Sequence, residues 1–235
     1  MSGADSLAAV AAEIVGCRRC PRLVSWREEA ARTKVARHAA EAYWGRPVPG
    51  FGDPDASVIV VGLAPAAHGG NRTGRVFTGD RSGDLLWSAL HATGFANQPV
   101  GRSRDDGLAL RGAYVAAAVR CAPPGNRPTP DERDACLPFL ARELALLPRL
   151  RVVVCLGGFA WEAALRVLAT TGVAVPRPRP RFGHGAEARV GPVVLLGAYH
   201  PSQQNTFTGR LTPAMFQSVL ARAAELGSVS FSTGW

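Results

Sequence analysis

The hydrophobic positions of the chain gather into four short runs of β-branched and aliphatic residues, at about 57–63, 113–119, 151–157 and 193–199. Runs that are apolar at every position are typical of strands covered on both faces of a sheet. Segments with a helical period lie between and after these runs, at 82–93, 130–147, 159–170 and 213–226. This alternation predicts an α/β fold, a three-layer α/β/α sandwich around a central, mainly parallel sheet of four strands.

Three of the predicted helices carry polar residues at their starts. Thr129 stands before Pro130 and three residues before Glu132, which is the pattern of a capping box with proline in the first turn. Ser82 and Thr212 are candidate N-caps for the helices that follow them.

The ends of the chain differ from this pattern. Residues 1–38 predict a helix, a pair of cysteines and a second helix, which we interpret as an extension packed on the main domain. The segment 176–185 is rich in Pro and Arg and predicts a basic loop, and 227–235 has no helical period and is expected to form a flexible tail. The 235 residues suit a single domain over 1–235.

Composition narrows the class of protein. Hydrophobic residues make up 47% of the chain, enough for a core, yet each apolar run is far shorter than the roughly 20 residues that span a bilayer. The first residues lack the basic start of a secretory signal. We therefore expect no membrane association, a cytoplasmic location and reduced thiols.

The charge balance points to an anionic partner. There are 27 basic against 18 acidic side chains, a net charge of +9, and every basic residue except Lys34 is Arg. A GC-rich genome explains a high Arg content, but it does not explain why Asp and Glu are scarce in particular segments. The excess lies mainly in 56–104 and 163–235, so we interpret it as a local footprint for phosphate, which the guanidinium group can bind through two parallel hydrogen bonds.

The loop after the first predicted strand, 62–83, is long, polar and rich in glycine. Ligands of parallel sheets bind at the carboxyl ends of strands, so this loop is a candidate site. The Gly-Lys-Ser/Thr ending of a phosphate-binding P-loop is absent. Arg72 and Arg75 are candidate phosphate contacts, while the glycines are also explained by turn formation alone.

Five cysteines supply a second candidate site. Cys17 and Cys20 form a CxxC pair, Cys121 follows a predicted strand and Cys136 lies in the next helix. Four thiolates suit either Zn²⁺ or a 4Fe-4S cluster, and unrelated buried cysteines are the alternative to both. Cys155, within an apolar run, is expected to be a buried core residue.

The fourth strand ends on a histidine. His200 is followed by small and amide side chains, and a histidine at this edge can donate a hydrogen bond to a substrate oxygen, although a structural role is the commoner one. We expect His38 and His91 to be surface or packing residues, and His184 stays open.

Four stretches occur in one order with the four cysteines interleaved: CRRCPRL at 17–23, GLAPAAHGGNRTGRVFTGD at 62–80, VRCAPPGNRPTP at 119–130 and YHPSQQNTFTGRLT at 199–212. Together they make the sequence resemble the uracil-DNA glycosylase superfamily, and within it the family 5 (type b) enzymes. The resemblance covers the chain from Cys17 to about Leu226.

This resemblance implies a DNA repair enzyme, a monofunctional uracil-DNA glycosylase that flips a base out of double-stranded DNA and hydrolyses its glycosidic bond. It also implies a 4Fe-4S cluster on Cys17, Cys20, Cys121 and Cys136, which ties the N-terminal extension to the domain. Family 5 acts on uracil, hydroxymethyluracil, ethenocytosine and deaminated purines such as hypoxanthine. We expect a monomer.

The resemblance assigns roles to individual side chains. Phe77 matches the aromatic that stacks on the flipped base, Asn126 the amide that binds its Watson–Crick edge, and His200 the donor to the pyrimidine O2. Further substrate contacts are expected from Gly62, Ala64, Ala66, His68 and Asn71. Contacts with DNA are expected from Arg72, Arg75, Ser202, Gln203, Gln204 and Asn205.

The resemblance also implies a catalytic carboxylate. Other members of the superfamily place Asp or Asn two residues after the first motif's glycine, where this chain has Ala64. Asp80 matches the acidic residue of family 5 and is the predicted catalytic carboxylate, with a helix-terminal role near Ser82 as its alternative. Another function remains open, a metal-stabilised DNA-binding module without catalysis in which the cysteines hold zinc.

Overall fold

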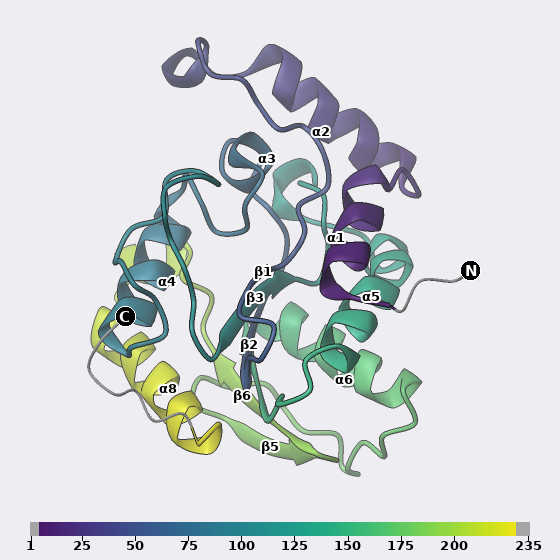
Figure 1. The fold of residues 1–235 in the computed structure, drawn as a ribbon, viewed down its shortest axis with the longest axis vertical. Coiled ribbons are helices and arrows are strands. Elements are labelled where there is room, and N and C mark those ends of the chain that lie inside the picture. Colours follow the sequence, from purple (N-terminus) through teal and green to yellow (C-terminus); the bar gives the residue numbers. More distant parts are fainter. Residues whose placement is uncertain (1–4, 229–235) are drawn as a thin grey trace.

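A mixed sheet of six strands runs through the middle of the molecule (Figure 1). The computed structural model describes residues 5–228. The strands lie in the order β1-β3-β2-β4-β6-β5. Their bounds are β1 Phe51–Gly52, β2 Val58–Gly62, β3 Ala113–Ala117, β4 Val152–Leu156, β5 Glu187–Val190 and β6 Val193–Ala198.

The four central strands confirm the predicted parallel sheet, because β3, β2, β4 and β6 pair in parallel. The predicted number of strands is wrong: β1 and β5 add antiparallel edges on β3 and β6. Neither edge has a continuous apolar run. β1 has two residues, and β5 leaves all its residues but Val190 exposed or half-buried, so hydrophobicity alone does not reveal them.

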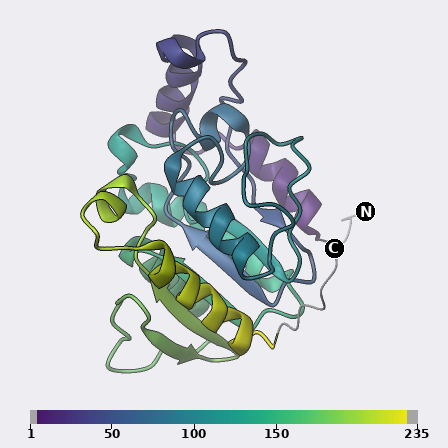
Figure 2. The ribbon, with the colours of Figure 1, turned by 90° about the vertical axis from the view of Figure 1, so that its left-hand side faces the viewer.

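Helices cover both faces of the sheet and confirm the three layers. On one face α4 and α8 pack on each other, and Figure 2 shows both in front of the sheet. On the other face α5 packs on α6 and α1 packs on α5. The helices are α1 Leu7–Gly16, α2 Pro21–Thr33, α3 Gly70–Thr73, α4 Arg81–Ala92, α5 Pro130–Ala145, α6 Gly158–Thr170, α7 Gln203–Phe207 and α8 Pro213–Leu226, with 3₁₀ turns η1 Ala36–His38 and η2 Pro124–Asn126.

The helix starts confirm two of the predicted caps. Thr129 and Glu132 form the capping box of α5, and the Thr212 hydroxyl accepts from the Met215 N–H at the start of α8. Ser82 is not an N-cap. Asp80 caps α4 instead, since its Oδ1 accepts from the Gly83 N–H at 3.0 Å. The helix therefore begins one residue earlier than Ser82, at Arg81.

The N-terminal extension has the predicted two helices, joined through the cysteine pair. Arg142 of α5 holds α1 through ion pairs with Asp5 at 2.7 Å and Glu13 at 2.6 Å. Segment 176–185 is a loop, as predicted. No helix among residues 5–228 is both long and apolar enough to cross a membrane. Most of the expected tail, 229–235, lies outside the described residues.

Candidate active site

Loops from β2, β3 and β6 enclose a cavity of about 660 Å³ at the carboxyl ends of these strands. Its wall is apolar where the loop after β2 begins, and polar side chains stand around it. The lining residues are Leu63, Ala64, Pro65, Ala66, Val76, Phe77, Asp80, Arg81, Ser82, Ala117, Gly125, Asn126, Arg127, His200, Ser202, Gln203 and Gln204. Of the predicted catalytic residues, Asp80, Asn126 and His200 are thus brought together from three separate segments.

Phe77 lies in this cavity with a backbone φ of 51°, in the left-handed region that a bulky side chain rarely adopts. The conformation is held in place because its carbonyl accepts from Trp87 Nε1 at 2.6 Å. Gly62 does not line the cavity. A side chain at Gly62 would collide with the Phe77 ring, so this glycine makes room for the aromatic instead of contacting a substrate.

Asp80 has two oxygens with different surroundings. Oδ1 accepts from Gly83 N–H as the cap of α4, which confirms the helix-terminal role. Oδ2 lies over Gly69, where any side chain would strike it. Burial raises the pKa of Asp80 above its ordinary value, with backbone N–H groups opposing the shift. The cap therefore fixes a carboxylate whose second oxygen is left at the cavity wall.

His200 is half-buried beside Phe77, with their ring centroids 6.1 Å apart. Burial lowers the pKa of His200 to about 4, so the imidazole is neutral at pH 7. Asn205 Nδ2 donates to the His200 carbonyl at 2.9 Å and supports the loop. The expected DNA contact of Asn205 is therefore not what its side-chain amide does here.

Asn126 stands exposed on η2 with a φ of 57°, a conformation that asparagine tolerates better than most residues. Its amide makes no hydrogen bond with any described residue, so it is available to a ligand. Ala64, Ala66, Ser202, Gln203 and Gln204 also line the cavity.

Two of the expected phosphate contacts are corrected by the structure. Arg75 is 3% exposed, pairs with Asp106 at 2.6 Å and donates to Thr78 Oγ1, so it cannot reach a phosphate in this conformation. Arg72 pairs with Glu41 and donates to the His68 carbonyl. Both guanidinium groups hold the glycine-rich loop together from within.

Two of the expected substrate contacts also lie elsewhere. Asn71 is fully buried and its Nδ2 donates to the Arg27 carbonyl at 3.1 Å, which fastens α3 to α2. His68 lines a neighbouring cavity rather than the first, and its Nδ1 pairs with the Tyr43 hydroxyl at 3.1 Å. Burial lowers the pKa of His68.

Sequence reasoning missed Arg81, at the cavity wall, and Phe207, which Arg81 contacts. Arg81 lines the cavity and stacks over the ring of Phe207, with its Cζ 5.1 Å from the ring centroid. Phe207, at the end of α7, is 68% exposed. The signal available in the sequence was a large apolar side chain within a polar segment, QQNTFTG.

The four predicted cysteine ligands line one small cavity between α1, α2 and α5. Burial raises the pKa of the Cys121 thiol to about 12 and that of Cys136 to about 11. Arg27 Nη1 donates to Cys121 Sγ and the Arg120 N–H donates to Cys136 Sγ, both at 3.3 Å. Such donors suit sulfur that carries negative charge, as a metal-bound thiolate does.

Within residues 5–228, no three His, Cys, Asp or Glu side chains converge into a group that could hold one metal ion. Cys155 is fully buried in β4, as expected of a core residue.

Comparison with known proteins identifies the family to which this chain is similar. Residues 49–224 match the family model of the Uracil DNA glycosylase superfamily. A Type-5 uracil-DNA glycosylase of Mycobacterium tuberculosis is 53% identical over 229 residues, covering 97% of this chain and 84% of the relative. One from Thermus thermophilus is 51% identical, covering 92% and 96%. A Type-4 uracil-DNA glycosylase of Archaeoglobus fulgidus is 28% identical, covering 84% and 82%.

This chain belongs to the uracil DNA glycosylase superfamily. The predicted enzyme class, a uracil-DNA glycosylase, is confirmed by relatives of about half identity over nearly the whole chain. The alternative of a binding module without catalysis loses its basis.

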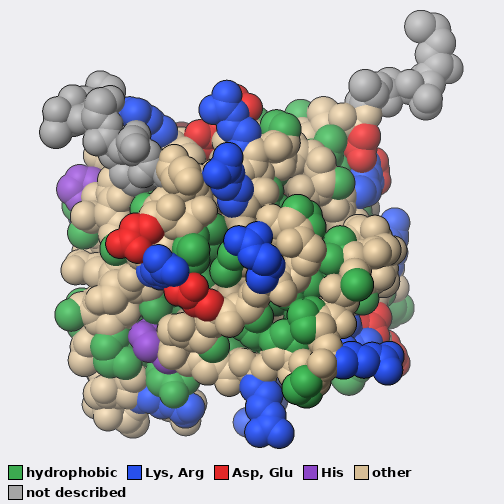
Figure 3. Space-filling view, turned by 90° about the horizontal axis from the view of Figure 1, so that it is seen from below, with side chains coloured by type: hydrophobic (Ala, Val, Ile, Leu, Met, Phe, Trp, Pro, Cys, Tyr) green, Lys and Arg blue, Asp and Glu red, His purple; other side chains and the backbone are tan. Residues whose placement is uncertain are grey.

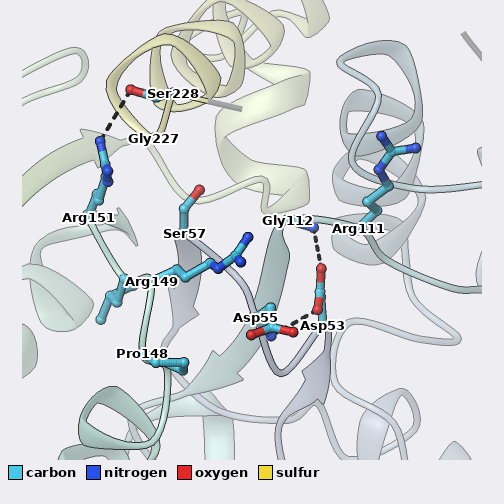
Figure 4. A pocket seen from close by; sticks show the side chains of 11 residues that line it. Asp53, Asp55, Ser57, Arg111, Gly112, Pro148, Arg149, Arg151, Gly227 and Ser228 are labelled. Atoms are coloured by element: carbon cyan, nitrogen blue, oxygen red, sulfur yellow. Dashed lines mark hydrogen bonds between the residues drawn. The ribbon is translucent and has the colours of Figure 1, made fainter. Parts of the chain in front are cut away.

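The glycosylase has a second large cavity, of about 620 Å³, at the amino ends of the strands (Figure 4). Figure 4 shows Arg149 extending toward its middle and Arg151 reaching along one side to Ser228, whose Oγ accepts from it at 3.3 Å. Asp53 Oδ2 accepts from the Gly112 N–H. A row of basic side chains crosses the face seen from below in Figure 3. None of the predicted catalytic residues lines this cavity.

Proposed function

We propose that this glycosylase hydrolyses the glycosidic bond of uracil in double-stranded DNA, with Asp80, Asn126 and His200 as its working groups. One observation carries the proposal. A carboxylate and a neutral imidazole from distant segments, Asp80 and His200, meet in one cavity beside Phe77, and burial shifts the pKa of each in opposite directions.

The reaction follows from these positions. The flipped base stacks on Phe77, and the Asn126 amide offers a donor and an acceptor to its edge. As the bond from C1′ to the base breaks, the electron pair leaves with the base and negative charge grows on its O2. Neutral His200 donates to that oxygen without transferring a proton.

The sugar left behind carries positive charge at C1′. The Asp80 carboxylate stabilises this charge and orients water, whose oxygen bonds to C1′ while its proton balances the charge of the departed base. The apolar start of the loop, Leu63 to Ala66, strengthens both interactions because it lowers the local dielectric.

We further propose that the chain is a type-5 (type b) enzyme with a broad base range that includes hydroxymethyluracil, ethenocytosine and hypoxanthine. Leu63, Ala64, Pro65 and Ala66 place no polar side chain on this part of the wall. A wall that makes few hydrogen bonds discriminates weakly between bases.

Phe207 is our candidate for the group that enters the base stack. It is exposed, lies five residues after Ser202 at the cavity rim, and is accompanied by the positive charge of Arg81. An apolar wedge between base pairs lowers the cost of flipping, and the guanidinium binds a nearby phosphate.

Cys17, Cys20, Cys121 and Cys136 are proposed to hold a 4Fe-4S cluster. Support comes from the cavity that the four thiols share and from the hydrogen-bond donors to two of the sulfurs. A cluster here would stabilise the junction of α1, α2 and α5. Visible charge-transfer absorption with about four iron atoms per chain supports it, and a colourless zinc protein contradicts it.

The decisive assay is release of free base from duplexes that carry one uracil, hypoxanthine or ethenocytosine. Wild-type protein is expected to release uracil, and Asp80→Asn to bind the same duplex without releasing it. A well-folded Asp80→Asn protein with full activity contradicts the proposed role. The proposal also includes a monomeric protein in the cytoplasm, acting within base excision repair.

A further inference from the structure

A smaller cavity of about 260 Å³ adjoins the proposed base pocket, at the carboxyl ends of the strands. The two share Ala66, Asp80, Gly125 and Asn126, so the proposed catalytic carboxylate stands between them. The outer wall of this smaller cavity does not belong to the sheet and the helices that cover it. It comes from the N-terminal extension, through Trp26 on α2 and Arg37 on η1.

Trp26 is unusual for its exposure. Only it, Val100 and Phe207 are exposed large hydrophobic side chains among the described residues, and Trp26 is 38% exposed. The helix has an adequate buried face without it, formed by Leu23, Val24, Arg27 and Ala30. The indole is therefore not needed to hold α2, and it offers a flat aromatic surface to the cavity.

Arg37 contributes an unused positive charge. It makes no hydrogen bond or ion pair with any residue of 5–228, whereas Arg72 on the adjoining loop is engaged by Glu41. The remaining polar group beside it, His68, has a pKa lowered by burial and adds no charge at neutral pH. An aromatic surface beside a free guanidinium is the chemistry that binds a nucleotide, by stacking on its base and pairing with its phosphate.

We infer that this cavity is a subsite for the nucleotide adjacent to the flipped one on the same strand, with Trp26 stacking on its base and Arg37 binding its phosphate. The inference rests on the proposed function. Because the two cavities meet at Asp80 and Asn126, neighbouring nucleotides of one strand can occupy both at once. The enzyme thereby holds the scissile sugar from two sides.

This subsite also gives the cysteine-bearing extension a role in substrate binding. Cys20 is the N-cap of α2, and Arg27 on the same helix donates to Cys121. Whatever fixes these thiols therefore fixes the position of Trp26 relative to Asp80.

The test pairs a protein change with a substrate change. Single-stranded oligonucleotides carry one uracil and, in two further versions, a tetrahydrofuran spacer in place of the 5′ or the 3′ neighbour, which removes that base but keeps its phosphate. For the wild type we expect kcat/KM to fall roughly five- to a hundredfold with the spacer on one side. In Trp26→Ala the same spacer is expected to cause no further loss, and in Trp26→Phe most of the wild-type sensitivity returns.

If Trp26→Ala is as sensitive to both spacers as the wild type, the subsite is wrong. For the charge, Arg37→Ala is expected to reduce the salt dependence of oligonucleotide binding by about one unit of slope, and Arg149→Ala, an equally unpaired arginine at the far edge, to leave it unchanged. Equal slopes for wild type and Arg37→Ala overturn the phosphate contact. Absence of uracil release by the wild type from a uracil-containing duplex contradicts the proposed function instead, so the two failures are distinguishable.

Discussion

Two cavities of similar size lie at opposite edges of the same sheet, about 660 Å³ at the carboxyl ends of the strands and about 620 Å³ at their amino ends. The first combines an apolar wall with Asp80 and His200, and burial raises the pKa of Asp80 and lowers that of His200. The second contains exposed Arg149, Arg151 and Asp55. Cavity volume therefore does not identify the active site. Burial of titratable groups does identify it, because charges removed from water act more strongly on a substrate.

The difference arises from topology. Parallel strands send the long loops after β2, β3 and β6 to one edge, where their side chains converge. At the amino ends of the strands, residues from four separate segments also line a cavity, but water reaches the charges of Arg149, Arg151 and Asp55 there.

The largest expected effect is on the carboxylate. Asp80→Asn keeps an oxygen to cap α4, so the fold should be retained, while kcat for uracil release should fall by about 10²–10⁴ because the charge at C1′ is no longer stabilised. Single-turnover kinetics measures the loss, and circular dichroism checks the fold. Asp55→Asn in the opposite cavity is the matched control and should be fully active.

A smaller loss is expected from moving Asp80 without changing it. The β-carbon of Gly69→Ala would collide with Asp80 Oδ2, and a displacement of that size can reduce kcat about a hundredfold. Gly16→Ala, where an added β-carbon meets open space, is the control. Normal activity in Gly69→Ala would show that the position of Oδ2 does not matter.

The dependence on pH tests the opposed shifts. Protonation of Asp80 abolishes its role, and its raised pKa places the acid limb of kcat/KM above the ordinary Asp value of about 3.9. His200, with a pKa of about 4, stays neutral, so no inflection near pH 6.5 is expected from it. A limb at 6.5 that disappears in His200→Gln contradicts this assignment.

Stability has its own pH dependence. The unfolded chain protonates His200 below about pH 6.5 and the folded protein only below about 4, so the stability present above 6.5 is lost as the pH falls through that window. Asp80 has the opposite sign, because its raised pKa costs stability as the pH rises through the folded value. Thermal unfolding of wild type and His200→Gln between pH 4 and 7 separates the first contribution, which should be absent in the variant.

A moderate effect is expected at the rim. Phe207→Ala should lower kcat/KM about tenfold on duplex DNA and less on single strands, because only the duplex must be unstacked. Equal losses on both substrates would assign Phe207 to simple binding.

The smallest effect is expected in the opposite cavity. The double variant Arg149→Ala and Arg151→Ala should leave the affinity for DNA and its salt dependence unchanged, whereas Arg81→Ala should reduce the salt slope by about one. Fluorescence anisotropy at several salt concentrations measures both. A matching loss in the double variant would mean that DNA also contacts the amino-terminal edge.

Much of the fold could be predicted from the sequence because its signals are local. The continuous apolar runs identified the four central strands, and Thr129 with Glu132 marked the start of α5. The edges β1 and β5 escaped because they are short or half exposed, and edge strands need no apolar run. Ser82 was an equally plausible cap as Asp80, since both have the required side-chain oxygen.

At the site, the sequence by itself determined which side chains exist near the strand ends, and the positions expected for Asp80, Asn126, His200 and Phe77 meet in one cavity. Only the tertiary structure decided how each is used. Arg75 forms an ion pair with Asp106, and Asn71 donates a hydrogen bond to the Arg27 carbonyl. Gly62 leaves the space that the ring of Phe77 occupies. Trp26 reaches the wall beside Asp80 although 54 positions separate them along the chain. The physical reason is that a residue's type fixes what it can bind, while burial and the partners packed against it decide what remains free to bind a substrate.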